Sequence, residues 1–161
     1  MADVPEPAAP LVLQTELGST PQDVRAVLAL VRMELTALGW GDTPIGAVEL
    51  VLAEALNNIV EHACAERSDG CIALALHADA LCAELTLRDD GHAMPDGGLP
   101  PGRLALPDRR QDLPEGGFGW YLIRKLSERL HYAREEGGNR LDILICRADH
   151  EAPPGTGGTA R

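Results

Sequence analysis

The stretch from Ala53 to Ala63 contains neither glycine nor proline, and its side chains repeat with the period of an α-helix. Glu54, Asn58 and His62 follow one another at intervals of four residues, so they lie along one side of that helix. This polar row is offset by roughly 100° or more from an apolar stripe. The stripe consists of Ile45, Val48, Leu52, Ala55, Leu56, Ile59 and Ala63. A carboxylate, a carboxamide and an imidazole at the border of a buried helix face indicate a functional site.

The periodicity of the rest of the chain predicts helices and paired strands around this helix. Helical spacing predicts helices over residues 21–38, 44–65 and 119–130, and Thr20-Pro21 and Asp42-Thr43-Pro44 are typical helix starts. Period-two patterns predict strands over residues 11–17, 71–77, 81–89, 131–135 and 141–146. Short turns between consecutive strands favour antiparallel hairpins. This order predicts an α+β fold, namely a two-layer sandwich with a mixed, mostly antiparallel sheet and three main helices.

The chain has 161 residues, which suits one domain with a sizeable core. We expect residues 1–10 to form a flexible arm, residues 11–147 to form the domain, and the Gly-, Pro- and Thr-rich residues 148–161 to form a disordered tail. Between about residues 92 and 116 the periodicity is lost, and prolines and glycines accumulate. Such a long loop is typical of a functional lid or of a disordered segment.

Composition narrows the classes of partner. The net charge of −11 and the pI of about 4.8 argue against nonspecific binding to nucleic acid and against docking on an anionic membrane. The cysteines are scattered without a C-x-x-C pair, so we expect them to be reduced, small buried side chains. Neither a secretory leader nor an apolar stretch of about 18 residues is evident, which predicts a cytoplasmic protein without a transmembrane helix.

Two further motifs carry chemistry. The alternation of the strand over residues 81–89 turns Asp89 toward its apolar side, where a carboxylate is costly unless it is paired or given a ligand. Gly116, Gly117 and Gly119 open the last helix, and backbone amides at such a helix start suit a phosphate. Each motif alone is weak, because Asp-x-Gly is a common turn and clustered glycines occur in many loops.

Together the three motifs resemble a known nucleotide site. In their order and distances, Glu54-x-x-x-Asn58-x-x-x-His62, Asp89-Asp90-Gly91 and the glycines after the loop resemble the GHKL ATPases, which include gyrase B, Hsp90, histidine kinases and MutL. The chain is most similar to the RsbW group of bacterial anti-sigma factor serine/threonine kinases, whose later glycines are arranged much as in residues 115–122. The resemblance covers roughly residues 10–147 and implies the Bergerat ATP-binding fold.

The resemblance implies a role for each matching residue. Asn58 would be the Mg²⁺ ligand, and Glu54 would be the general base that orients or deprotonates the attacking hydroxyl. Asp89 would accept a hydrogen bond from the adenine amino group, and Gly91 would let the backbone pass close to the base. The lid would close over the phosphates through Gly116, Gly117, Phe118 and Gly119. No chemical step requires His62, which is equally well explained as a histidine at the edge of the core.

The implied function is that of an ATP- and Mg²⁺-dependent protein kinase in a bacterial partner-switching system. Its substrate would be a STAS-domain anti-sigma factor antagonist, it would hold a sigma factor or another effector, and it would form a homodimer. Two alternatives stay open: an ATP-binding regulator that sequesters a partner without kinase activity, and an interaction module that binds no nucleotide. Taken singly, Glu54 and Asn58 are also explained as ordinary polar residues on the surface of a helix.

Some residues depart from the family pattern or have two explanations. Ala93 stands where the wider superfamily has a second glycine. Asn139-Arg140-Leu141 occupies the region where the last strand often brings a threonine to the adenine-binding aspartate, which puts the hydrogen bonds around the base in doubt. The loop arginines could reach a γ-phosphate or be solvated charges; they are Arg103, Arg109 and Arg110.

Overall fold

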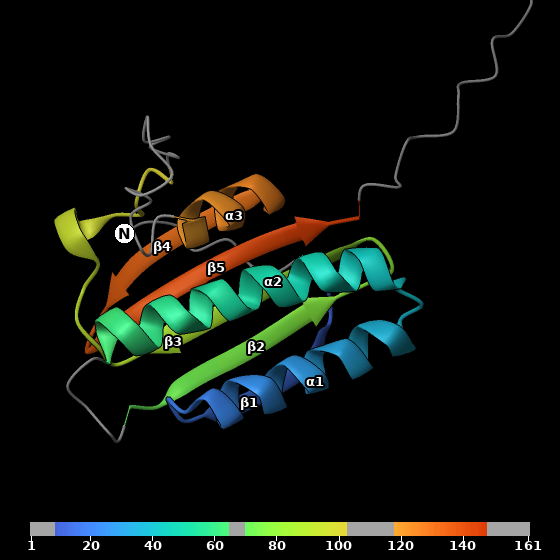
Figure 1. Cartoon of the computed structure of the whole chain (residues 1–161), viewed down its shortest axis with the longest axis horizontal. Coiled ribbons are helices and arrows are strands. Elements are labelled where there is room, and N and C mark those ends of the chain that lie inside the picture. The colour runs from blue at the N-terminus through green and yellow to red at the C-terminus, as the bar shows by residue number, and fades with distance from the viewer. Residues whose placement is uncertain (1–8, 65–69, 103–117, 148–161) are drawn as a thin grey trace, which may run out of the picture.

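The computed structural model describes residues 9–64, 70–102 and 118–147, which form one two-layer α+β domain (Figure 1). The strands are β1 (Leu11–Leu17), β2 (Ile72–Ala78), β3 (Cys82–Asp89), β4 (Arg129–Glu135) and β5 (Gly138–Cys146). The helices are α1 (Pro21–Ala37), α2 (Asp42–Asn58) and α3 (Phe118–Leu126), with a π-helical turn over Ile59–Ala63 and a 3₁₀ turn over Pro95–Gly97. The predicted fold class and its three main helices are confirmed.

The strands form one sheet in the order β1-β2-β3-β5-β4, and every strand pair within the described residues is antiparallel. The three helices cover one face of this sheet, with α2 lying between α1 and α3 (Figure 1). The register of β3 against β5 places Asp89 opposite Asn139. Both residues are therefore held at the same end of the two inner strands.

The core between the layers is aliphatic, as the low aromatic content of the chain requires. The apolar stripe of α2 is buried against alternate residues of the central strands, and the largest fully buried side chains include Leu52, Leu56, Leu74, Leu85 and Ile143. By length and mean hydropathy alone, Asp42–Ala63 could cross a membrane. The same segment carries Glu49, Glu54 and Asn58, and its apolar side packs on the sheet, as expected of the core helix of a globular domain.

The helix starts are partly as predicted. Thr20 and Asp23 form a capping box at α1, in which the Asp23 backbone N–H donates to Thr20 Oγ1 (3.2 Å) and the Thr20 N–H donates to Asp23 Oδ2 (3.1 Å). The predicted start of α2 is wrong by two residues, because this helix begins at Asp42 after Gly41, without a side-chain cap. Pro44 is tolerated inside the first turn, where a backbone N–H has no partner within the helix.

The end of α2 also differs from the continuous helix that the sequence predicts. After Asn58 the chain turns with π-helical geometry to Ala63, whose carbonyl oxygen accepts a hydrogen bond from the His92 N–H (3.2 Å). Gly91 passes so close that a Cβ atom on it would lie 2.3 Å from the Ala63 carbonyl oxygen. The segment that follows β3 is thus packed directly on the end of the helix.

The expectation that the cysteines are reduced and buried is wrong for three of the four. Cys82 and Cys146 are opposite each other in the register of β3 and β5, and they form a disulfide. Cys64 is a buried free thiol, whereas Cys71 is exposed. The disulfide joins residues that are 64 positions apart in the chain. The spacing of the cysteines in the sequence does not indicate this pairing.

We predict that Gly91→Ala lowers the free energy of unfolding by about 1–3 kcal/mol, because the new methyl group meets backbone atoms that cannot rotate away. Gly46→Ala is the matched control, since no atom lies within 4 Å of its Cβ position inside α2. We expect this control to raise stability by about 0.4–1 kcal/mol. Urea unfolding measures both variants, and equal stability of the two would contradict this packing.

A pH-dependent contribution is expected at the β2–β3 turn. The backbone N–H groups of Cys82 and Leu81 donate to Asp79 Oδ1 (2.8 and 2.7 Å) and lower the pKa of the Asp79 carboxyl. Because the folded-state pKa is the lower one, this stabilisation is present above the unfolded pKa of about 3.9 and is lost as the pH falls through the folded value. Asp79→Asn should therefore destabilise the domain at pH 7 by about 0.5–1 kcal/mol and by less at pH 2.5. Urea unfolding at the two pH values measures this, with Glu61→Gln matching the change in net charge; a gap that does not shrink would contradict the prediction.

Candidate functional site

A cavity of about 380 Å³ lies between the end of α2, the ends of the two inner strands and the start of α3. Its volume is within the range of small-molecule sites, and most of its lining is apolar or aromatic. The lining side chains are Ala55, Asn58, Ile59, His62, Ala63, Asp89, His92, Ala93, Met94, Pro95, Pro100, Trp120, Tyr132, Asn139 and Leu141. The cavity therefore brings together residues from the first two sequence motifs.

Asp89 is buried on the helix side of β3, in the direction that the alternation predicts, and it is 8% exposed. Its Oδ1 accepts hydrogen bonds from the Gly91 N–H (2.8 Å) and from Asn139 Nδ2 (2.9 Å). No hydrogen bond to Oδ2 occurs from any residue that the structure describes. One oxygen thus anchors the carboxylate, and the other remains as an acceptor in the wall of the cavity.

Asn58 lines the same cavity, and its Nδ2 is buried without a hydrogen-bond partner in the described part of the chain. Buried polar atoms in folded proteins are nearly always paired. A carboxamide also offers an oxygen acceptor when it turns by half a rotation. The residues that the structure describes therefore leave this polar group unpaired beside the cavity.

Glu54 does not line the cavity but lies beside it, against the first turn of α3. A Cβ atom on Gly119 would lie 2.6 Å from Glu54 Oε2 and 3.7 Å from Asn58 Nδ2. The absence of a side chain at Gly119 therefore allows α3 to approach α2 where both polar residues emerge. A carboxylate at the positive N-terminal end of a helix is electrostatically favourable.

His62 lies in the π-helical turn that follows Asn58, and it lines the same cavity as Asn58. His62 is exposed and lies at the rim of the cavity. Gly116 and Gly117 and the three loop arginines lie outside the described residues, whereas Phe118 is exposed at the start of α3.

Asn139 is a buried member of the site that the motif comparison did not identify. It is 6% exposed and faces the cavity beside Asp89. The alternation of Leu141, Ile143 and Ile145 places Asn139 on the helix side of β5, and this was the signal in the sequence that could have identified it. Trp120 and Tyr132 supply aromatic walls that were likewise not predicted.

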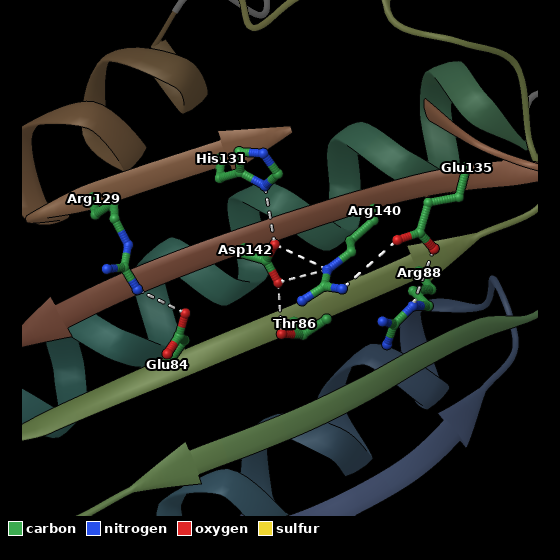
Figure 2. Close-up of polar contacts among 8 residues, drawn as sticks. All are labelled: Glu84, Thr86, Arg88, Arg129, His131, Glu135, Arg140 and Asp142. Carbon is green, nitrogen blue, oxygen red and sulfur yellow. Dashed lines mark hydrogen bonds and ion pairs between the residues drawn. The ribbon is translucent and has the colours of Figure 1, made fainter. Parts of the chain in front are cut away.

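Arg140 follows Asn139 in the part of the last strand where the sequence departs from the family pattern. It points away from the cavity. Figure 2 shows it on the face of the sheet that the helices do not cover. Its Nε lies 2.9 Å from Asp142 Oδ2 and its Nη1 lies 3.6 Å from Glu135 Oε1. Asp142 is almost fully buried and is also bonded by Thr86 Oγ1 (2.7 Å) and His131 Nδ1 (3.2 Å). The charge of Arg140 is thus engaged on the opposite face and does not enter the cavity.

The arrangement suits a flat ring with an amino group at one end and a polar, anionic group at the other. Asp89 provides a fixed acceptor beside aromatic and aliphatic walls. Asn58, Glu54 and the glycine at the start of α3 are grouped next to the helix terminus. Oxygen donors of this kind, few in number, suit Mg²⁺ bound together with phosphates.

Comparisons with known proteins identify the domain. Residues 17–145 match the family described as the histidine kinase-like ATPase domain. No curated protein matches the chain.

Solved structures are also similar to this chain. The structure of the RsbU and RsbW domains of Rv1364c from Mycobacterium tuberculosis is 20% identical to this chain, with a TM-score of 0.55. The alignment covers 84% of this chain and 32% of that one, so this chain spans about a third of the length of the two-domain chain that it matches. The histidine kinase domain of the blue-light activated histidine kinase from Erythrobacter litoralis EL346 is also 20% identical, with 74% of this chain and 60% of that chain covered and a TM-score of 0.46.

The family match includes α2, β3 and β5, which carry Asn58, Asp89 and Asn139. It confirms the GHKL resemblance that the three motifs predict. The chain belongs to the histidine kinase-like ATPase domain family.

Proposed function

We propose that this chain binds Mg-ATP in the cavity and transfers the γ-phosphate to a serine or threonine of a partner protein. The observation that carries the proposal is that Asp89 and Asn58 line the same cavity. The first keeps an acceptor oxygen without a protein partner, and the second has a buried nitrogen without one, among the residues that the structure describes. Two unused polar groups in a largely apolar cavity imply a ligand with polar groups at both ends.

In the proposed orientation, the adenine lies against Trp120 and Tyr132 with its amino group toward Asp89. The phosphates then extend toward Asn58 and the first turn of α3. Backbone amides and the helix dipole favour anions at that position. The acidic chain, with a net charge of −11, makes this local positive end important for holding a polyphosphate.

The donor set fits magnesium at the phosphate end. Asn58 would hold the ion through its side-chain oxygen. Its Nδ2 is buried without a hydrogen-bond partner among the described residues, so no bond to that nitrogen opposes a turn of the carboxamide toward a ligand. When bound, Mg²⁺ would neutralise phosphate charge and polarise the transferred group. The carboxylate of Glu54 lies one helical turn away, where it could accept the proton of an attacking hydroxyl.

We further propose a partner-switching role in the cytoplasm. A STAS-domain anti-sigma factor antagonist would be the substrate. Its phosphorylation would release it and leave a homodimer of this chain free to hold a sigma factor or another effector. The RsbU and RsbW domain organisation named for the mycobacterial structure is the support for this class of partner. The acidic composition argues against nucleic acid and membrane surfaces as partners.

A second candidate function is an ATP-binding regulator that sequesters its partner without phosphate transfer. It is favoured by the position of Glu54, which lies outside the cavity lining and against Gly119. A base in that position has to reach the hydroxyl of a partner protein that enters beside α3. If no partner does so, the chain binds nucleotide without catalysis.

We predict that Glu54→Gln lowers γ-phosphate transfer by about 10²–10⁴-fold and leaves Mg-ATP affinity within about threefold, because only the proton acceptor is removed. The measurement is transfer from labelled ATP to the STAS-domain protein recovered with this chain from its source cell. Glu61→Gln, the same change on an exposed part of the π-helical turn, should transfer phosphate as the wild type does. Equal transfer by Glu54→Gln and wild type would remove Glu54 from the mechanism, and binding without transfer by the wild type would favour the regulator.

A further inference from the structure

We propose that Asn139 determines the base specificity of this site, by fixing Asp89 as a hydrogen-bond acceptor and by coupling it to the cavity wall formed by residues 91–94. The inference rests on the proposed nucleotide function and adds to it a residue and a selectivity. It predicts that the site takes a purine with an exocyclic amino group at position 6 and rejects a purine with an oxo group there. Asn139 acts through Asp89, so it is a positioning residue.

The carboxamide of Asn139 is bonded at both of its ends. Nδ2 donates to Asp89 Oδ1 (2.9 Å) and to the His92 carbonyl oxygen (2.8 Å). Oδ1 accepts from Tyr132 Oη (2.7 Å) and from Arg134 Nη1 (2.9 Å). Asn139 is only 6% exposed, so water contributes little to these interactions. The group is therefore held by two acceptors on one side and by two donors on the other.

This pattern fixes the direction of the amide. Turning it by half a rotation would place its oxygen against the Asp89 carboxylate and its NH₂ group against the Arg134 guanidinium. The contacts with Asp89, with the His92 carbonyl and with Arg134 would all become unfavourable in a buried setting, where unpaired polar groups are costly. The orientation of the Tyr132 hydroxyl is fixed as well, because it donates to Asn139 and accepts from the Met94 N–H (3.0 Å).

The fixed amide in turn fixes what Asp89 offers to a ligand. Both hydrogen bonds that the structure gives its carboxylate are to Oδ1, from Gly91 N and Asn139 Nδ2. Oδ2 then faces a ligand only as an acceptor, so an amino group can bind it. A carbonyl oxygen at the same place would bring two acceptors together, and sites built around a specific hydrogen bond reject such analogues strongly.

The same residues hold the wall of the cavity. Arg134 Nη1 donates to the Gly91 carbonyl oxygen (2.7 Å), Asn139 donates to that of His92, and Tyr132 accepts from Met94. His92 and Met94 line the cavity. The β4–β5 hairpin thus fixes the acceptor for the base and the segment beside it through Asn139 and the two side chains bonded to it, Tyr132 and Arg134. Loss of Asn139 should weaken binding through both effects.

The reverse face of the sheet supports this hairpin. Arg140 follows Asn139 on β5 and is bonded to Asp142 and Glu135, which ties β5 to β4 on the face without helices (Figure 2). Asn139 and Arg140 therefore anchor the same stretch of strand from opposite sides. At these two positions, where the sequence departs from the family pattern, the side chains thus form a hydrogen-bond network.

The test is the affinity of the purified chain for Mg-ATP and Mg-GTP, measured by competition with a fluorescent ATP analogue. Wild type should prefer ATP by about 100-fold or more. Asn139→Leu, which keeps the size of the side chain, should weaken ATP binding by about 10- to 100-fold and weaken GTP binding much less, through the wall alone, so that the preference falls to about tenfold or less. Asn57→Leu, the same change at an exposed residue outside this cavity, should retain the wild-type preference.

Tyr132→Phe provides a second variant that keeps the shape of the core and removes only the hydroxyl between Asn139 and Met94. It should weaken ATP binding by about three- to tenfold and reduce the preference in the same direction. If a thermal melt shows that Asn139→Leu is not folded, the nucleotide preference of Tyr132→Phe becomes the test of the inference. An unchanged ATP preference in a folded Asn139→Leu, or in Tyr132→Phe where only that variant folds, would overturn the inference while leaving the proposed function intact. Failure of the wild type to bind either nucleotide would instead remove the proposed function, and the inference with it.

Discussion

The buried carboxylate of Asp89 is the constraint on which the rest of the site depends. A charge at the end of a core strand costs free energy unless hydrogen bonds offset the loss of water. The chain supplies two such bonds, and both require neighbours in exact places: the Gly91 N–H immediately after the strand, and Asn139 opposite in the register of β5. The turn after β3 and the pairing of the inner strands therefore serve the same carboxylate.

This constraint continues into the helical layer. For its N–H to reach Asp89, Gly91 passes directly over the end of α2, where even a methyl group would meet the Ala63 carbonyl. The helix ends there in a π-helical turn, and its last carbonyl accepts from the His92 N–H. The cavity lies beside this contact, with Asn58 at the start of the turn. Packing between strand and helix thus sets the distance between the two polar groups that a nucleotide would join.

Local patterns in the sequence were sufficient to predict the helices and strands and the face of the sheet toward which Asp89 points. The helix start at Thr20-Pro21, the alternation of β3 and the hairpin turns depend on neighbours in the chain, and each was predicted. Asn139, the Cys82–Cys146 disulfide and the π-helical turn depend on residues that meet only through the register of the sheet or through the approach of Gly91. The contact of Glu54 with Gly119 is of the same kind. It joins α2 to α3, and these helices are separated in the chain by β2, β3 and the loop that follows. The alternation of β5 indicates the face on which Asn139 lies, but the partners in these contacts have no signature in spacing or composition.

The central claim is that Asp89 and Asn58 mark the two ends of one nucleotide site. Isothermal titration of the wild-type chain with ATP, in magnesium and then in excess EDTA, tests it most directly. The account predicts one ATP bound per chain, with an affinity that falls by about tenfold or more when magnesium is removed, since Asn58 would hold the ion at the phosphate end of the cavity. No heat of binding in magnesium, or an affinity that is identical with and without it, would contradict the account.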